Sequence, residues 1–245
     1  MKNYIILGII QGILEWIPIS SEGVVGLWSQ FFLRKFNPLD IALFLHAGTL
    51  FVVLVYFRRE WMEILRGKNP FLLRFLIITT LVSLIVAFPI YKTIRNRIFG
   101  GIFLAIMGLG LLVTSFFQRT KRKVRIGRDK LAILTGILQG LAVIPGISRS
   151  GATIFGLSLG NFSPQEILRI SYMASAPIIF LSSIYLVWKN PNFIFPGWIS
   201  LVFSFLTGII TLHCLIGWVK RVNFSYFTFI FGLLCLVGAI FEFLF

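Results

Sequence analysis

Long runs of apolar residues, each about as long as a membrane is thick, are the feature that most limits how this chain can fold. A helix needs about 20 mostly apolar residues to cross the hydrocarbon core of a bilayer. Six segments reach this length: 39–57, 71–91, 98–117, 167–187, 198–218 and 224–245. Of the 245 residues, 58% are hydrophobic and only 13% are charged, which excludes a soluble domain, a disordered protein and a secreted disulfide scaffold. We therefore predict an all-α integral membrane protein with six transmembrane helices.

Two further apolar segments, 4–32 and 131–159, are interrupted by turn-forming residues. The first contains Pro-Ile-Ser-Ser-Glu-Gly at 18–23, and the second contains Pro-Gly-Ile-Ser-Arg-Ser-Gly at 145–151. Each half is roughly a dozen residues long, too short to cross a core of about 30 Å at 1.5 Å per residue. Irregular backbone at this depth is tolerated only within protein or beside a water-filled cavity. We predict that each segment enters the membrane, turns and leaves on the same side, as a re-entrant helical hairpin.

The two interrupted segments repeat one another. A shift of 128 residues aligns them without a gap and gives seven identities in the 16 positions from 8 to 23. Three predicted spans follow each segment, so the second half would be inverted relative to the first. We predict one membrane domain, 1–245, in which repeat one (1–118) and repeat two (131–245) are joined by the basic loop 119–130. In transporters with such repeats, the broken helices mark the binding site near the membrane midplane.

The distribution of basic residues indicates the orientation. The formal net charge is +15. Loops 57–71 and 117–131, together with Arg74, Arg169, Lys220 and Arg221, carry 15 Lys and Arg residues, against seven on the opposite side. Because cytoplasmic loops carry the excess of basic residues, we predict that these loops are cytoplasmic and that both termini are external. The charge then reflects topology in a cell (plasma or inner) membrane and contact with anionic headgroups, without a nucleic-acid partner.

Ionisable side chains inside membrane segments are costly, by about 2.5–3.5 kcal/mol each on insertion scales, and few occur here. Gln11 and Glu15 are one helical turn apart, Glu22 lies in the first break and Arg149 lies in the second. Glu15 is either an interfacial carboxylate that reaches water or a buried carboxylate paired with Arg149. We favour the pair, because pairing would offset the desolvation of both charges.

The breaks also supply hydrogen-bond donors for an anion. Each break leads into a short helix whose first backbone N–H groups are free to bind one, and a guanidinium suits phosphate oxygens. Serines in membrane helices also serve packing alone, but mirrored breaks favour a phosphate site. A carboxylate beside it would act as a general base or bind a divalent cation. The candidate phosphate-binding residues are Ser20, Ser148, Arg149, Ser150 and Gly151.

His46 lies inside the predicted span 39–57, within Leu-His-Ala-Gly-Thr. A lone histidine in a membrane helix is either a hydrogen-bonded strut between helices or a group that acts beside the site. Both interpretations stay open from the sequence alone.

Two motifs resemble those of a known family. Residues 11–21, Gln-Gly-Ile-Leu-Glu-Trp-Ile-Pro-Ile-Ser-Ser, look like the first motif of the undecaprenyl-diphosphate phosphatases, also called the bacitracin-resistance family. Residues 145–153, Pro-Gly-Ile-Ser-Arg-Ser-Gly-Ala-Thr, look like the second, and runs at 46–50 and 171–177 are also similar. The resemblance covers nearly the whole chain. It implies an inverted repeat with two re-entrant hairpins, a divalent cation (Mg²⁺ or Ca²⁺) and a site open to the external face.

The resemblance also implies roles for individual residues. The catalytic residues would be Gln11, Glu15, Ser21 and Arg149, with Ser21 or a water as nucleophile. Glu15 and Gln11 would hold the metal. Many members have a histidine where this chain has Val24, so Glu22, Glu15 or His46 would carry out proton transfer here.

The expected function is hydrolysis of a polyprenyl (undecaprenyl-type) diphosphate to the monophosphate and inorganic phosphate, which recycles a lipid carrier for cell-envelope glycans. The alternative is a transporter or flippase of a lipid phosphate or another anion, without hydrolysis. A purely structural scaffold would not explain the mirrored breaks. The expected partners are the lipid substrate, the membrane and a second copy in a homodimer.

Overall fold

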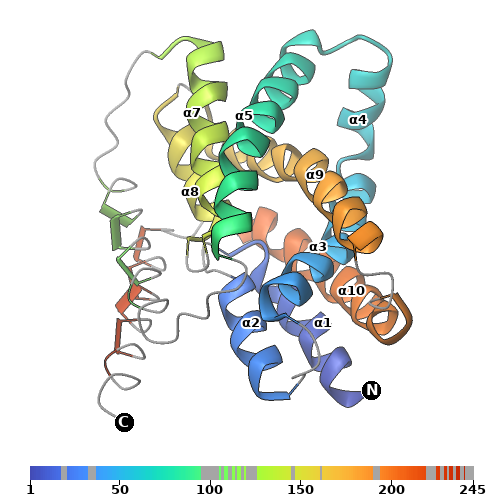
Figure 1. Ribbon diagram of the computed structural model, residues 1–245. Helices are drawn as coiled ribbons and strands as arrows, with labels where there is room; N and C mark the ends of the chain where they lie inside the picture. The colour runs from blue at the N-terminus through green and yellow to red at the C-terminus, as the bar shows by residue number, and fades with distance from the viewer. Residues whose placement is uncertain are drawn as a thin grey trace.

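The computed structural model (Figure 1) describes residues 1–17, 21–32, 37–94, 126–144, 147–160, 162–189 and 194–218, and single positions within 105–119 and 225–240. In these parts the regular structure is helical, without a strand. The prediction of an all-α protein is confirmed for them.

Three described helices are long and apolar enough to cross a membrane: α5 (Pro70–Ile94), α9 (Pro164–Lys189) and α10 (Ile194–Trp218). A fourth candidate is α3 (Pro38–Tyr56), which bends by 74° into the short helix α4 (Arg58–Leu65). These four helices coincide with predicted spans. Residues 58–65, which we expected in a loop, form α4 instead.

The remaining predicted spans, 98–117 and 224–245, lie largely outside the described residues. Where single positions are described, the two segments touch, because Ser115 Oγ donates a hydrogen bond of 2.7 Å to the carbonyl of Ser225.

Three of the long helices begin with the same N-terminal capping arrangement. A polar residue precedes a proline at the first helical position, where the missing N–H costs nothing. The polar side chain then accepts a hydrogen bond from a backbone N–H one turn on. The pairs are Asn37 with Asp40 N at 3.3 Å, Asn69 with Leu72 N at 3.1 Å and Ser163 with Glu166 N at 3.3 Å. The Glu166 carboxylate also accepts from Ser163 N at 2.8 Å, which completes a capping box.

Each interrupted segment forms two short helices. The first gives α1 (Lys2–Leu14) and α2 (Ser21–Phe32), and the second gives α7 (Arg128–Leu141) and α8 (Arg149–Ser158). Ser148 starts α8, because its Oγ accepts from Gly151 N at 3.1 Å as an N-cap. Figure 1 shows α1 and α2 in the lower half of the molecule, and α7 and α8 in the upper half.

The first helix of each segment packs against a long helix from the other half of the chain. Helix α1 lies against α10, and α7 lies against α5. A Cβ added to Gly12 of α1 would lie 2.7 Å from the backbone oxygen of Ser204. A Cβ added to Gly140 of α7 would lie 2.9 Å from the backbone oxygen of Ser83. Small residues four apart let membrane helices approach this closely.

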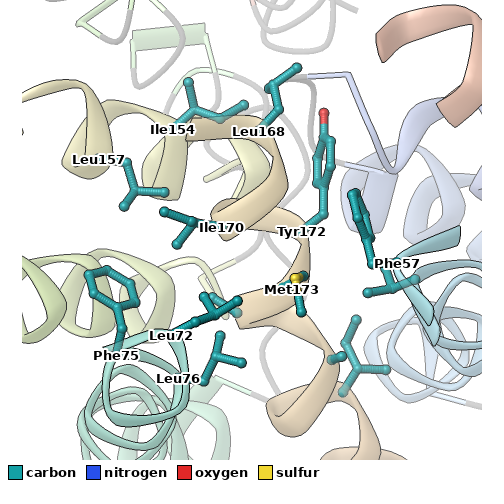
Figure 2. Packing of buried hydrophobic residues seen from close by; sticks show 14 of the residues in the cluster. Phe57, Leu72, Phe75, Leu76, Ile154, Leu157, Leu168, Ile170, Tyr172 and Met173 are labelled. Atoms are coloured by element: carbon teal, nitrogen blue, oxygen red, sulfur yellow. The ribbon is translucent and has the colours of Figure 1, made fainter. Parts of the chain in front are cut away.

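The main apolar core joins α5, α8 and α9 to the bend between α3 and α4. Figure 2 shows part of this cluster, in which Phe57 lies at the bend, Phe75 belongs to α5, Leu157 to α8 and Met173 to α9. The outer surface is also apolar, since Trp188 is 83% exposed and Ile85 is 74% exposed. A surface of this kind belongs in lipid, so the described helices form a multi-pass membrane protein.

We expect Gly140→Ala to destabilise the protein, because the added Cβ would lie 2.6 Å from the Cβ of Val86 and 2.9 Å from the backbone oxygen of Ser83. Overpacking of this kind costs about 1–3 kcal/mol. In a chain of this size about 1 kcal/mol lowers the unfolding midpoint by roughly 2–4 °C. The measurement is thermal unfolding in detergent.

The matched control is Gly217→Ala in α10, where an added Cβ meets nothing within 4 Å. This variant should keep or raise the midpoint. Equal midpoints for both variants would contradict the close packing of α7 on α5.

Candidate functional site

The site is centred on Glu15, the residue that ends α1. Its backbone N–H donates to the carbonyl of Gln11 at 3.0 Å, and its side chain is almost fully buried. The Gln11 side chain projects from the same face one turn earlier, and its Nε2 donates to Glu15 Oε2 at 2.7 Å. The structure thus brings together the two residues that the i, i+4 spacing places on one face.

Two further helices contribute donors to the same carboxylate oxygen. Ser21, the first residue of α2, donates from Oγ to Glu15 Oε2 at 3.0 Å. His46 of α3 places Nε2 3.1 Å from Glu15 Oε2 and 3.8 Å from Glu22 Oε1. Side chains from α1, α2 and α3 therefore surround one oxygen atom of Glu15.

The contacts of His46 bear on the two interpretations of that residue. Its Nδ1 lies 2.7 Å from the carbonyl of Ala42, which can only accept, so Nδ1 donates this bond. The other ring nitrogen, Nε2, faces the carboxylates of Glu15 and Glu22. His46 thus lies within the site and links α3 to it.

The second break reaches Glu15 through Arg149, in the first turn of α8. The guanidinium Nη2 forms an ion pair with Glu15 Oε1, and both side chains are largely buried. Two hydrogen bonds accompany this pair. Ser150 Oγ donates to the carbonyl of Ile17 at 3.0 Å, and the Tyr172 hydroxyl of α9 donates to the carbonyl of Trp16 at 2.8 Å. The ends of the two interrupted segments are therefore in contact.

The predicted phosphate-binding serines already have partners within the protein. Ser148 accepts from the N–H of Gly151, and the hydroxyls of Ser148 and Ser150 lie 3.2 Å apart. Ser20 lies outside the described residues. Among the predicted donors it is Arg149 that keeps a free group, because its Nε is buried without a hydrogen-bond partner.

Three oxygen atoms in the site are also buried without a hydrogen-bond partner: Oε1 of Gln11, Oε2 of Glu22, and Oε1 of Glu15, whose contact is the ion pair with Arg149. An unpaired buried polar group costs about 1–3 kcal/mol, so Gln11 Oε1 and Glu22 Oε2 are suited to contact a bound water or ligand. Carboxylate and amide oxygens are suitable ligands for Mg²⁺ or Ca²⁺. Among the described residues, however, no group of three or more His, Cys, Asp or Glu side chains is arranged to hold a metal. A cation here would need oxygens from the substrate as well.

Two adjoining cavities share Glu22, His46 and Arg149. The smaller is a polar space of about 10 Å³ between Glu15, Ser21 and the start of α8, which is room for about one water molecule. The larger has a volume of about 330 Å³ and is lined mainly by apolar side chains of α5 and α9. Its wall includes Phe88 and Leu181, which are 47% and 41% exposed and so reach the outer surface. The arrangement suits a ligand with an anionic head and an apolar tail.

Sequence reasoning missed Gln139, which lines the larger cavity. Its Nε2 donates to Ser83 Oγ at 3.0 Å and to the carbonyl of Ala174 at 3.3 Å, while its Oε1 has no hydrogen-bond partner. The repeat could have revealed it, because Gln139 is the counterpart of Gln11 at the 128-residue shift. Val24, at the position of the usual family histidine, is not among the residues lining either cavity.

We expect cysteines at positions 17 and 150 to be joined by a short bifunctional thiol reagent, because the Ser150 hydroxyl lies 3.0 Å from the Ile17 carbonyl. The background would carry Cys214→Ala and Cys235→Ala, with a protease site inserted into loop 119–130. After cleavage, the two halves should stay joined on a non-reducing gel. A control pair at 17 and 158 should not join them, since eight residues of helix separate positions 150 and 158 by about 12 Å. Separation of the halves in the 17/150 variant would show that the two segments do not meet.

Comparison with known proteins identifies the family. The sequence model of the family described as "Bacitracin resistance protein BacA" matches residues 4–237. A protein of Methanococcoides burtonii named undecaprenyl-diphosphatase is 35% identical over 96% of each chain. Proteins with the same name from Haloarcula marismortui and Methanothrix thermoacetophila are each 33% identical, over 96% of both chains and over 95% and 94% respectively. This chain therefore belongs to the bacitracin resistance protein BacA family.

Proposed function

We propose that this protein is a membrane phosphatase that hydrolyses undecaprenyl diphosphate to undecaprenyl phosphate and inorganic phosphate. Relatives named undecaprenyl-diphosphatase match it over nearly their full length. The observation that carries the proposal is the buried ion pair between Glu15 and Arg149 at the polar end of an apolar cavity. A transporter would account for a binding site, but the names of the relatives favour hydrolysis.

The same proposal includes an inverted repeat with two re-entrant hairpins. Two observations support it. The helix pairs α1 with α10 and α7 with α5 are related by exchange of the two halves, and each is built on two glycines four residues apart. The contacts of Ser150 with Ile17 and of Arg149 with Glu15 join the segments at their breaks. With the basic loops in the cytoplasm, the termini and the site would face the external side.

The substrate would lie with its diphosphate at the polar end and its first prenyl units in the larger cavity. The wall between α5 and α9 includes exposed apolar side chains, so the rest of the lipid would pass sideways into the bilayer. The apolar chain moves from lipid into an equally apolar cavity, so its transfer contributes little free energy, and the phosphates provide both affinity and specificity.

Binding must open the Glu15–Arg149 pair, because the polar space of about 10 Å³ has no room for a phosphate group. We infer that Arg149 exchanges the carboxylate for the substrate phosphates, which a guanidinium binds in the same forked manner. Glu15 is then free to act as a base while Gln11 and His46 hold it in place. The exchange of partners at Arg149 thus binds the substrate and at the same time frees Glu15 to act as the base.

In the chemical step, the hydroxyl of Ser21, or a water in its place, attacks the terminal phosphorus and gives its proton to Glu15. The bond from this phosphorus to the bridging oxygen breaks, and the lipid monophosphate leaves. Arg149 stabilises the negative charge on the transferred phosphoryl group. If Ser21 attacks, water then hydrolyses the phosphoserine and releases phosphate. Glu22 beside His46 is placed to take part in proton transfer.

A divalent cation, Mg²⁺ or Ca²⁺, would bind to Gln11 Oε1 and Glu22 Oε2, whose hydrogen-bonding capacity is unused within the protein. Once Arg149 has moved to the substrate, Oε1 of Glu15 is also free to bind the cation, as the first motif implies. When bound, the cation would neutralise part of the charge of the diphosphate.

The test is release of inorganic phosphate from undecaprenyl diphosphate by the purified protein, with Mg²⁺ and with a chelator. We expect Glu15→Gln and Arg149→Lys each to lower kcat at least about 100-fold, the usual loss when a general base or a charge-stabilising donor is removed. Controls are Glu63→Gln in α4 and Arg169→Lys in α9, which keep wild-type turnover.

Thermal unfolding of each variant shows that it is folded. Wild-type protein that releases no phosphate with Mg²⁺ would contradict the proposed function. Full turnover in folded Arg149→Lys protein would remove the guanidinium from the mechanism.

A further inference from the structure

We propose that Lys92 and Lys189 form a capture site for the substrate diphosphate at the outer mouth of the larger cavity. The inference rests on the proposed function and adds a step to it, the first contact between the headgroup and the protein. It assigns a role to two residues that lie outside both motifs.

Each of the two lysines lies at the C-terminal end of a long helix. Lys92 is in the last turn of α5, and Lys189 is the last residue of α9. Both side chains are exposed. The ends of membrane-spanning helices lie where hydrocarbon gives way to lipid headgroups, which is the depth at which the diphosphate of a membrane-bound lipid resides.

Each lysine lies over an aromatic ring that lines the cavity. Lys92 Nζ is 4.5 Å from the ring centre of Phe88, and Lys189 Nζ is 5.5 Å from that of Tyr185. The Lys189 ammonium also donates to the Tyr185 hydroxyl at 3.4 Å. Both rings belong to the cavity wall. The ammonium groups are therefore held over the wall by cation–π contacts.

The aromatic rings bring the two lysines to one rim. Phe88 and Tyr185 are 6.1 Å apart between ring centres and stand at 80° to each other. Tyr91 contacts Tyr185 in the same way, at 6.1 Å and 84°. The cluster joins the C-terminal ends of α5 and α9, so both positive charges flank the same opening.

The charges along the cavity form a path for an anion. The two ammonium groups lie at the outer rim, and Arg149 lines the inner end beside the polar space, together with His46 and the carboxylate of Glu22. Among the described residues, a carboxylate near the rim is that of Asp40, which is buried and accepts a hydrogen bond of 2.6 Å from the Tyr91 hydroxyl. Apolar walls concentrate the field of such charges and raise the rate at which an oppositely charged ligand associates.

A second role for these lysines is purely structural, since a cation in the last turn stabilises the helix dipole and anchors the helix at the interface. The two roles differ in what they affect. Capture changes kcat/KM in a way that depends on salt, whereas a structural role changes the amount of folded protein.

The experiment compares the rim variant, Lys92→Gln/Lys189→Gln, with a control variant, Lys68→Gln/Lys130→Gln. The control removes the same number of positive charges away from the cavity mouth, since Lys68 lies two residues before the start of α5 and Lys130 lies in α7. Phosphate release from undecaprenyl diphosphate is measured in neutral phosphatidylcholine vesicles at several salt concentrations. We expect the rim variant to lose about tenfold in kcat/KM at low salt, with kcat within about twofold, because steering of this kind is worth 10-fold or more and is screened by salt. The difference from wild type should vanish at high salt, and Lys92→Arg/Lys189→Arg should behave like the wild type.

Equal kcat/KM for the rim and control variants at low salt would overturn the capture site, as would a loss in the rim variant that does not change with salt. In parallel, the amount of undecaprenyl diphosphate that each immobilised variant retains is measured. This compares substrate binding by the rim and control variants without requiring catalysis. If the wild type binds the lipid but releases no phosphate, the proposed function fails while the capture site is still tested.

Discussion

A carboxylate and a guanidinium buried in a membrane protein must neutralise each other, and much of this structure follows from that requirement. Each charge alone would cost several kcal/mol in a low-dielectric interior. Glu15 and Arg149 come from opposite halves of the chain, so their pairing requires the two interrupted segments to meet. Glu15 follows the last residue of α1 and Arg149 is the first residue of α8, so the pair forms where each helix meets its break.

The packing around the pair holds the two segments at that point. The close approach of Gly12 to α10 and of Gly140 to α5 brings the short helices deep among the long ones. The hydrogen bonds to the carbonyls of Ile17 and Trp16 use backbone groups that the first break leaves free of helical partners. The result is a closed site with one polar end and a larger apolar cavity beside it. In the proposed mechanism, a substrate with two phosphates replaces the carboxylate as partner of Arg149, and this exchange connects binding to chemistry.

The sequence was sufficient to predict the helices and the principal charges of the site. Hydropathy located α3, α5, α9 and α10, and the cost of burying a lone charge predicted that Glu15 and Arg149 would pair. The predicted spans begin one residue after the start of α5 and three residues after that of α9, because Asn69 before Pro70 and Ser163 before Pro164 set those starts through side-chain hydrogen bonds. Serine content alone could not show that Ser148 caps α8 and that Ser150 binds Ile17. The partners of His46 depend on how α3 packs against α1 and α2, which is tertiary information.

The most direct test of this account is a double-mutant cycle on Glu15→Gln and Arg149→Gln, read as the thermal unfolding midpoint in detergent. Loss of one partner leaves the other as a buried unpaired charge, at about 3–5 kcal/mol. The account predicts that each single variant unfolds well below the wild type, and that the double variant unfolds above at least one of them. Additive losses, as expected for residues that do not interact, would contradict the contact between the two segments.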